Sequence, residues 1–254
     1  KKKKIGETDA DVFFVLGFAH AQARLWQLIT LRRTAQGRLS EIFGPATVTT
    51  DKLMRRYDIY RLAVASADKL DPETKSALEA YSAGINARLD QINTEALGRG
   101  APEMWLFNAP MAPWRPADSL AITKLMGLQM SGHLEAEVLR ARVSLELSDQ
   151  DRLRDILPDA PGSGVAALPE YAALFPEVTT RHAAAVPMDS HPLSPFKRQA
   201  FAGASNAWAA APTRSAAGGT LLANDPHLGF TAPAIWYLAR LELETGGVIG
   251  GTIP

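Results

Sequence analysis

Apolar residues near the start of the chain recur at steps of three and four positions. Thr8 and Asp11 precede them at capping-box spacing, which is typical of a helix N-terminus. The series predicts an amphipathic helix with a wide buried face, formed by Phe14, Phe18, Ala21, Leu25 and Leu28.

Five polar side chains interrupt this first pattern. We expect the arginines on the other sides of the helix or near its C-terminal end, where cations suit the helix dipole: Arg24, Arg32, Arg33 and Arg38. His20 stands among Phe and Ala residues. It is therefore expected to be a hydrogen-bonded core histidine rather than a ligand or a base.

A second helix is predicted to start at Asp71-Pro72-Glu73, with Asp as the cap and Pro at the first helical position. Its apolar face is Leu78, Tyr81, Ile85, Leu89 and Ile92, and we expect it to end at Gly98 and Gly100. Residues 102–116 then hold four prolines, which predicts an ordered irregular connection packed by Trp105 and Trp114.

A third helical region is expected from Asp118 to about Leu147, with kinks at Gly127 and Gly132. Two acidic residues follow the second glycine, Glu135 and Glu137. They are either solvated helix charges or include an oxygen ligand for a hard cation such as calcium.

The pattern is lost between residues 158 and 204. Seven of the chain's 17 prolines fall here, among alanine, serine and short apolar patches. Proline removes a backbone donor and interrupts a helix, and structureless stretches this long are uncommon inside a compact domain. The segment is predicted to be a linker, a lid or a processing segment.

Strand and turn signals follow this segment. Residues 206–212 and 220–223 are predicted to pair as a β-hairpin through the turn at 215–219. Folding the hairpin about that turn brings Ser205 roughly opposite Pro226-His227-Leu228. Residues 235–243 are a candidate third strand, with a helix as the alternative.

Composition narrows the function classes. Twenty-seven basic residues balance 27 acidic ones, so nothing indicates a nucleic-acid partner. The absence of cysteine excludes disulfides, thiolate metal sites and a cysteine nucleophile. The apolar run at 12–21 is too short to span a bilayer, and the lysines at 1–4 are interpreted as a solvated end.

Ser205 does not fit an ordinary nucleophile elbow. The second glycine of that motif is missing, and the serine leads into a strand rather than a helix. A triad of Ser205, His227 and Asp225 is an alternative, although direct contact between Asp225 and His227 is not expected.

Several motifs, taken in order, resemble the penicillin acylase family of N-terminal-nucleophile hydrolases. The first half contributes Gly17-Phe18-Ala19-His20-Ala21-Gln22-Ala23-Arg24-Leu25-Trp26-Gln27, Gly37-Arg38-Leu39-Ser40-Glu41 and Pro113-Trp114-Arg115-Pro116-Ala117-Asp118-Ser119. The second half contributes Gly203-Ala204-Ser205-Asn206-Ala207-Trp208, followed by Leu221-Leu222-Ala223-Asn224-Asp225-Pro226-His227-Leu228.

The resemblance implies an α+β, αββα-type fold, of which this chain carries a part. Residues 1–157 correspond to a helical α-chain, residues 158–204 to a spacer propeptide, and residues 205–254 to the start of a β-chain. The precursor is expected to cleave itself between Ala204 and Ser205. The free α-amine of Ser205, with an unperturbed pKa of about 7.7–8.0, then acts as the base for its own hydroxyl.

Further site residues follow from the resemblance alone. His227 matches a position that supports the oxyanion and the serine region, and Asn206 one that positions the nucleophile. Leu228, Met130 and Ser131 match the acyl pocket. Glu137, with Glu135 as second choice, matches the ligand of a structural calcium ion; no cofactor is expected for the chemistry itself.

The expected function is hydrolysis of an acyl amide through an ester on Ser205. Penicillin-like, cephalosporin-like and N-acyl-homoserine lactone substrates all remain open. The expected partners are this small molecule and the remainder of the β-chain, with no nucleic acid and no membrane. A periplasmic or secreted location is expected, without a signal peptide in this chain.

Two alternatives are a non-catalytic relative that acts as a binding scaffold and a serine hydrolase that uses His227 as its base. The oxyanion asparagine and further calcium ligands are expected beyond Pro254. The 254-residue chain alone is therefore expected to have little or no turnover.

Overall fold

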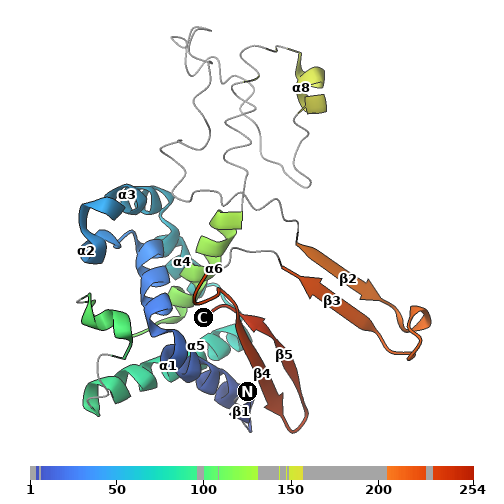
Figure 1. Cartoon of the computed structure of the whole chain (residues 1–254), viewed down its shortest axis with the longest axis horizontal. Coiled ribbons are helices and arrows are strands. Elements are labelled where there is room, and N and C mark those ends of the chain that lie inside the picture. Colours follow the sequence, from blue (N-terminus) through green and yellow to red (C-terminus); the bar gives the residue numbers. More distant parts are fainter. Residues whose placement is uncertain are drawn as a thin grey trace. The chain divides into compact units, whose positions relative to one another are not determined.

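The computed structural model of this chain describes residues 4–5, 7–95, 100–107, 109–130, 143, 147, 149–156, 205–226 and 231–254. The chain divides into two compact units, Lys1–Ile122 with Pro195–Pro254, and Thr123–Ser194. The helices of the first unit are α1 (Asp9–Gln36), α2 (Ser40–Phe43), η1 (Gly44–Thr47), α3 (Val48–Tyr57), α4 (Ile59–Ala67), α5 (Pro72–Thr94), η2 (Pro102–Trp105) and the start of α6 (Pro116–Met130) (Figure 1). The second unit holds the end of α6 and α8 (Gln150–Ile156).

Two small sheets belong to the first unit. One has the strand order β1-β4-β5, in which β1 (Lys4–Ile5) runs parallel to β4 (Tyr237–Leu243), and β4 runs antiparallel to β5 (Gly246–Thr252). The other is the hairpin of β2 (Asn206–Ala210) and β3 (Leu221–Asp225), with the 3-10 turn η5 (Pro212–Arg214) between the strands. The strand interpretation of residues 235–243 is therefore confirmed over β4.

The long helices start where their capping residues predict. The Thr8 side chain accepts a hydrogen bond from the backbone N–H of Asp11, and the Asp11 carboxylate accepts one from the N–H of Thr8, which completes the capping box of α1. Asp71 caps α5 through the N–H of Thr74, with Pro72 at the first helical position. The expected ends are less accurate, since α5 already stops at Thr94 and α6 begins at Pro116 rather than Asp118.

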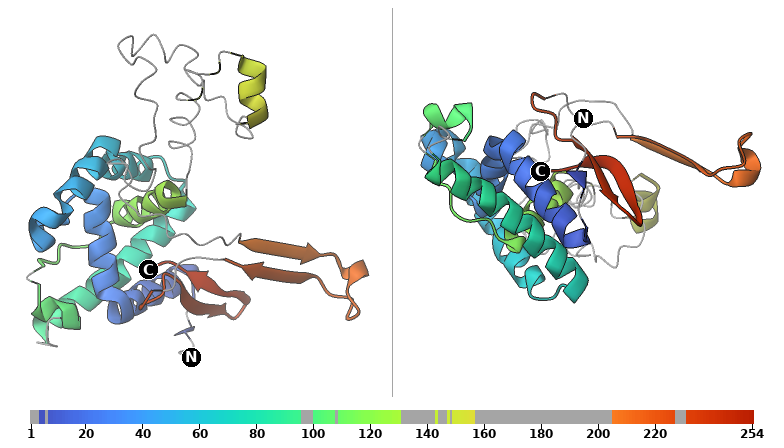
Figure 2. Two further views of the ribbon diagram at one scale, coloured as in Figure 1. Left: turned by 45° about the horizontal axis from the view of Figure 1, so that its top comes forward. Right: turned by 90° about the horizontal axis from the view of Figure 1, so that it is seen from below.

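The core lies mainly where α1 and α5 cross (Figure 2). The crossing is close because both helices carry a glycine there. A Cβ at Gly17 would collide with the carbonyl oxygen of Tyr81, and a Cβ at Gly84 with that of Phe14. The buried apolar side chains that surround the crossing include Leu25, Leu28, Tyr81, Ile85, Leu89 and Ile92.

His20 is fully buried in this core, as expected. Its Nδ1 shares a hydrogen bond of 2.7 Å with the hydroxyl of Tyr81. Its ring meets those of Tyr81 and Tyr237 edge-on. Burial raises the pKa of the Tyr81 hydroxyl, which therefore stays protonated at neutral pH.

The burial of two arginines is a further finding. Arg33 lies in the last turn of α1, as expected, and both Arg32 and Arg33 are buried, where carbonyl oxygens of the 110–113 connection accept their hydrogen bonds. Trp114 packs the connection as predicted, but Trp105 is 67% exposed, because its short 3-10 turn contributes the neighbouring Met104 to the core instead. The backbone of Lys4 is paired with Leu241 in β1, so the lysine run is not a free end at this residue.

Within the described part of the chain, α1 is the one helix with the length and apolar composition of a membrane span. Its best 18-residue window has a mean hydropathy of 1.2, and half of that window is buried inside the protein. This burial is what the core helix of a packed domain requires. The apolar run at 12–21, which is too short for a bilayer, is therefore only a part of the longer helix α1.

Candidate active site

Ser205 is the residue that directly precedes β2, and its side chain is exposed. The antiparallel register pairs Asn206 with Asp225 and Ala210 with Leu221. Extending this register by one residue sets Ser205 opposite Pro226. The predicted hairpin and its register are therefore confirmed, while His227 and Leu228 lie outside the described residues.

Side chains alternate along paired strands, and directly opposed residues share a face. Asn206 and Asp225 accordingly lie on one face of the hairpin. Ser205 itself directly precedes the paired residues.

The expectation that Asp225 and His227 do not contact each other assumed that residues two apart in an extended strand point to opposite faces, and this assumption is wrong. Residues two apart in an extended strand share a face, so spacing alone does not keep Asp225 from His227. Asp225 pairs with Asn206 rather than with Ser205, and His227 lies outside the described residues, so the triad stays an untested alternative.

The remaining predicted site residues fall elsewhere. Met130 is the last residue of α6. Ala204, Ser131, Glu135 and Glu137 lie outside the described residues, as does the whole 158–204 segment. Among the residues that the structure describes, no three His, Asp or Glu side chains lie close enough together to hold a metal ion. The calcium ligand at Glu137 stays a prediction.

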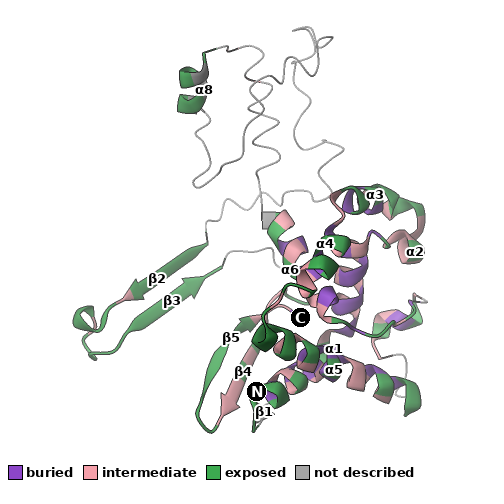
Figure 3. Ribbon diagram, turned by 180° about the vertical axis from the view of Figure 1, so that it is seen from behind, coloured by how far each residue is buried: buried purple, intermediate pink, exposed green. Residues whose placement is uncertain are grey.

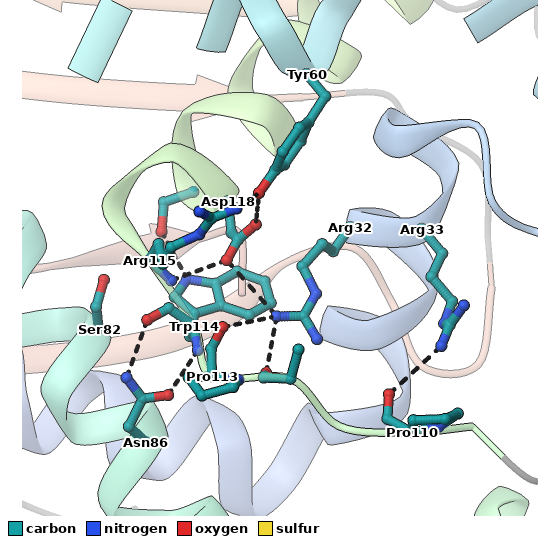
Figure 4. A network of polar contacts seen from close by, with 12 residues as sticks. Arg32, Arg33, Tyr60, Ser82, Asn86, Pro110, Pro113, Trp114, Arg115 and Asp118 are labelled. Carbon is teal, nitrogen blue, oxygen red and sulfur yellow. Dashed lines mark hydrogen bonds and ion pairs between the residues drawn. The ribbon is translucent and has the colours of Figure 1, made fainter. Parts of the chain in front are cut away.

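A buried polar network beside the core was not foreseen from the sequence (Figure 4). Asp118 is 1% exposed and accepts hydrogen bonds of 2.8 Å from the Tyr60 hydroxyl and from the backbone N–H of Arg115. Its other close neighbour is the Arg32 guanidinium, at 3.6 Å. Asp118 therefore both closes the first turn of α6 and neutralises a buried arginine.

The same network ties down the connection that leads into α6. Arg32 donates to the carbonyl oxygens of Ala112 and Pro113, and its guanidinium lies 5.0 Å from the ring centre of Trp114. Asn86 of α5 exchanges two hydrogen bonds with the backbone of Trp114. The start of α6 is thus fixed to α1, α4 and α5 at once.

In this network the pKa of Arg32 is lowered and the pKa of Tyr60 is raised. Burial lowers the pKa of Arg32, and the neighbouring Asp118 carboxylate acts against this effect. Burial, and then the hydrogen bond to Asp118, raises the pKa of Tyr60. At neutral pH the phenol is protonated and donates to the carboxylate. The signal for this network was present in the Trp114 to Ser119 motif, but its partners are distant in the sequence.

Comparison with known proteins gives the class of the molecule. The chain matches the penicillin amidase family over residues 5–254, and it belongs to that family. The resemblance inferred from the motifs is therefore confirmed. The fold class is confirmed with it: this is an α+β chain of the N-terminal-nucleophile hydrolase type, with a mainly helical first part and later strands that belong to two small sheets.

Two curated relatives are similar over nearly all of this chain. The penicillin acylase 2 proenzyme of Pseudomonas sp. (strain SE83) is 34% identical over 257 residues, which cover 97% of this chain and 31% of the relative. The acyl-homoserine lactone acylase QuiP of Pseudomonas aeruginosa is 29% identical over 263 residues, covering 96% and 29%. The chain thus spans about a third of the length of the curated relatives that it matches.

A solved structure of a thermostable penicillin G acylase from Alcaligenes faecalis is also similar. It covers 63% of this chain and 88% of its own, with a TM-score of 0.46 at 21% identity.

Proposed function

We propose that this chain is the processing and nucleophile-bearing part of an acylase precursor. The observation that carries the proposal is the position of Ser205 directly before a paired strand, in a chain of the penicillin amidase family. A serine there becomes the first residue of a strand-forming chain once the Ala204–Ser205 bond is cut.

The cut is a rearrangement followed by hydrolysis. The Ser205 hydroxyl attacks the carbonyl carbon of Ala204, and the C–N bond breaks as the serine nitrogen takes up a proton. The ester formed on Ser205 is then hydrolysed by water, which leaves a carboxylate on Ala204 and a free α-amine on Ser205. In the uncut chain this nitrogen is an amide and has no basicity to offer.

In turnover the new amine accepts the proton of its own hydroxyl, directly or through a water molecule. The hydroxyl oxygen attacks the carbonyl carbon of an acyl amide, the amine product leaves with a proton, and the acyl group stays on Ser205 as an ester. Water then releases the acid and restores the serine. An α-amine suits this role because its unperturbed pKa of about 7.7–8.0 lies near neutral pH.

The other proposed roles rest on the family resemblance. Asn206 positions the nucleophile, His227 supports the oxyanion region, and Leu228, Met130 and Ser131 line the acyl pocket. Glu137 would supply a carboxylate oxygen to a structural calcium ion. The partner of the α-chain, residues 1–157, is the β-chain that begins at Ser205, and the whole protein is proposed to act outside the cytoplasm.

The names of the relatives define the substrates to test: penicillins and N-acyl-homoserine lactones, to which we add cephalosporin-type amides. The whole protein, including the sequence that follows residue 254, is assayed against these amides with varied acyl chains. We expect hydrolysis of at least one class and, on acid quenching, an acyl mass on the peptide that begins with Ser205.

Matched variants test the assignment of the nucleophile. Ser205→Ala is expected to abolish both hydrolysis and the acylated peptide. Ser215→Ala changes a serine in the turn of the same hairpin, and it is expected to leave both unchanged. Hydrolysis that survives in Ser205→Ala, or in a chain that is never cut, would contradict the proposal.

A further inference from the structure

Arg24 reaches from α1 to the segment that enters β4. Its Nη1 donates to the carbonyl oxygen of Ala234 at 2.7 Å, and its Nη2 lies 3.5 Å from that of Trp236. A third hydrogen bond, 3.1 Å to the side-chain oxygen of Gln27, holds the guanidinium in place. The planar fork of an arginine can bridge two such carbonyl oxygens, whereas a lysine presents a point charge.

His20 contacts the same segment from the preceding turn of α1. Arg24 lies at a kink of α1, where its backbone angles are not helical (φ −139°, ψ 26°), so its place beside His20 is shown by their shared contacts and not by helix spacing. The His20 ring lies 4.7 Å from that of Tyr237, centre to centre, and the Arg24 guanidinium carbon lies 5.9 Å from the same ring. His20 and Arg24, on the two sides of this kink, therefore both contact the segment of residues 234–237.

This contact continues along the strands that follow. Ala239 and Leu241 of β4 and Ile253 after β5 pack against the helical core. The backbone of Leu241 also pairs with Lys4 in β1. Every one of these contacts joins a residue before position 205 to a residue after it.

We propose that His20 and Arg24 form a clamp that keeps the two chains together after cleavage. The inference rests on the proposed cut between Ala204 and Ser205, because that cut turns the clamp into a contact between separate chains. The clamp recognises both the backbone and one side chain of its partner: Arg24 binds the carbonyl oxygens of Ala234 and Trp236, and both clamp residues contact the ring of Tyr237. It assigns a role to the Gly17 to Gln27 motif, to which the chemistry at Ser205 gives none.

Chain exchange in the whole processed protein tests the clamp. Isotope-labelled and unlabelled proteins are mixed, and the mixed complexes are followed by native mass spectrometry. Arg24→Met removes the hydrogen bonds and the charge while keeping an unbranched side chain. A hydrogen bond from a charged group is worth about 1.5 kcal/mol at the low end, so exchange is expected to accelerate about tenfold.

Controls separate the clamp from general stability. Arg38→Met removes an arginine whose partner among the described residues, Glu41, lies in the same first part of the chain, and this variant is expected to exchange like the wild type. Arg24→Met in the uncut Ser205→Ala background is expected to fold as a single chain. If Arg24→Met is not cut before Ser205, Arg24→Lys replaces it. The exchange rate of Arg24→Lys is then expected to exceed that of the wild type.

The outcomes distinguish this inference from the proposed function. Cleaved chains whose exchange rate is unchanged by Arg24→Met, or by Arg24→Lys where it replaces that variant, overturn the clamp alone. A wild type that is never cut overturns the proposed cleavage, and the clamp with it.

Discussion

The helical region and the two hairpins of the first unit differ in how they bury apolar side chains. In α1 and α5 the large apolar residues face one another, and Leu28 and Ile85 are at most 1% exposed. In β2, β3 and β5 they face solvent: Trp208, Leu222 and Ile249 are between 58% and 79% exposed (Figure 3). The helices are thus held by side-chain packing, and the hairpins mainly by backbone pairing.

This difference indicates where the chain tolerates change. A substitution in the helical crossing alters contacts that cannot relax, because the interior is close-packed. The same substitution in a hairpin alters little that is buried. The nucleophile lies at the start of such a hairpin, while the helical region supplies the rigid body on which β4 is held.

The largest effect is expected at the buried carboxylate of the helical region. Asp118→Ala leaves the buried Arg32 guanidinium without its counter-charge and should lower the free energy of unfolding by about 4 kcal/mol. Asp151→Ala removes an exposed partner of Arg154 and is expected to change nothing measurable. Urea unfolding measures the loss of unfolding free energy in both variants. Equal losses would contradict the expected difference between the buried and the exposed carboxylate.

A matched pair of leucines tests packing directly. Leu28→Ala removes a fully buried side chain and should cost about 3 kcal/mol. Leu222→Ala, at a residue 79% exposed in β3, should cost under about 0.5 kcal/mol. If Leu222→Ala proved as costly in this chain, the hairpin would be packed in solution, and the contrast would fail.

Two glycines, one in the helical crossing and one in β5, test the same difference in packing. Gly84→Ala places a methyl group against the carbonyl oxygen of Phe14 and should cost about 2 kcal/mol despite the better helix propensity of alanine. Gly250→Ala in β5 meets nothing within 4 Å and should stay within about 0.5 kcal/mol of the wild type. Thermal unfolding of the two variants decides whether α1 and α5 cross as closely as described.

The smallest effect concerns an exposed ion pair of the helical region. A hydrogen bond from Arg38, and then Arg33, lowers the pKa of Glu41 to about 2. A carboxylate with a lowered pKa stabilises the fold above its unfolded value of about 4.3, and this contribution is lost as the pH falls towards 2. Glu41→Gln should therefore unfold at a slightly lower urea concentration than the wild type at pH 6, and at the same urea concentration as the wild type at pH 2. A difference that persists at pH 2 would rule out this ionisation as its cause.

The sequence predicted local features more accurately than distant ones. The caps at Thr8 and Asp71 and the register of the β2–β3 hairpin each depend on residues close together in the chain, and all are confirmed. The positions of Arg32, Arg33 and Asp118 depend on partners up to 86 residues away, so no local pattern indicated that they are buried.

The candidate site follows the same rule. The pairing of Asn206 with Asp225, and with it the place of Ser205, could be predicted from the turn between the strands. The clamp of Arg24 on Ala234 could not, because it joins residues 210 positions apart. The pocket and calcium residues around Met130 and Glu137 rest on family resemblance and stay predictions.

Intact-mass and N-terminal peptide analysis of the whole protein shows whether Ser205 becomes an N-terminus. We expect a chain that begins with Ser205 in the wild type and a single uncut chain in Ser205→Ala. Ser215→Ala should be cut like the wild type. An uncut wild type that still hydrolyses acyl amides, or a cut that persists in Ser205→Ala, would show that Ser205 is not the N-terminal nucleophile.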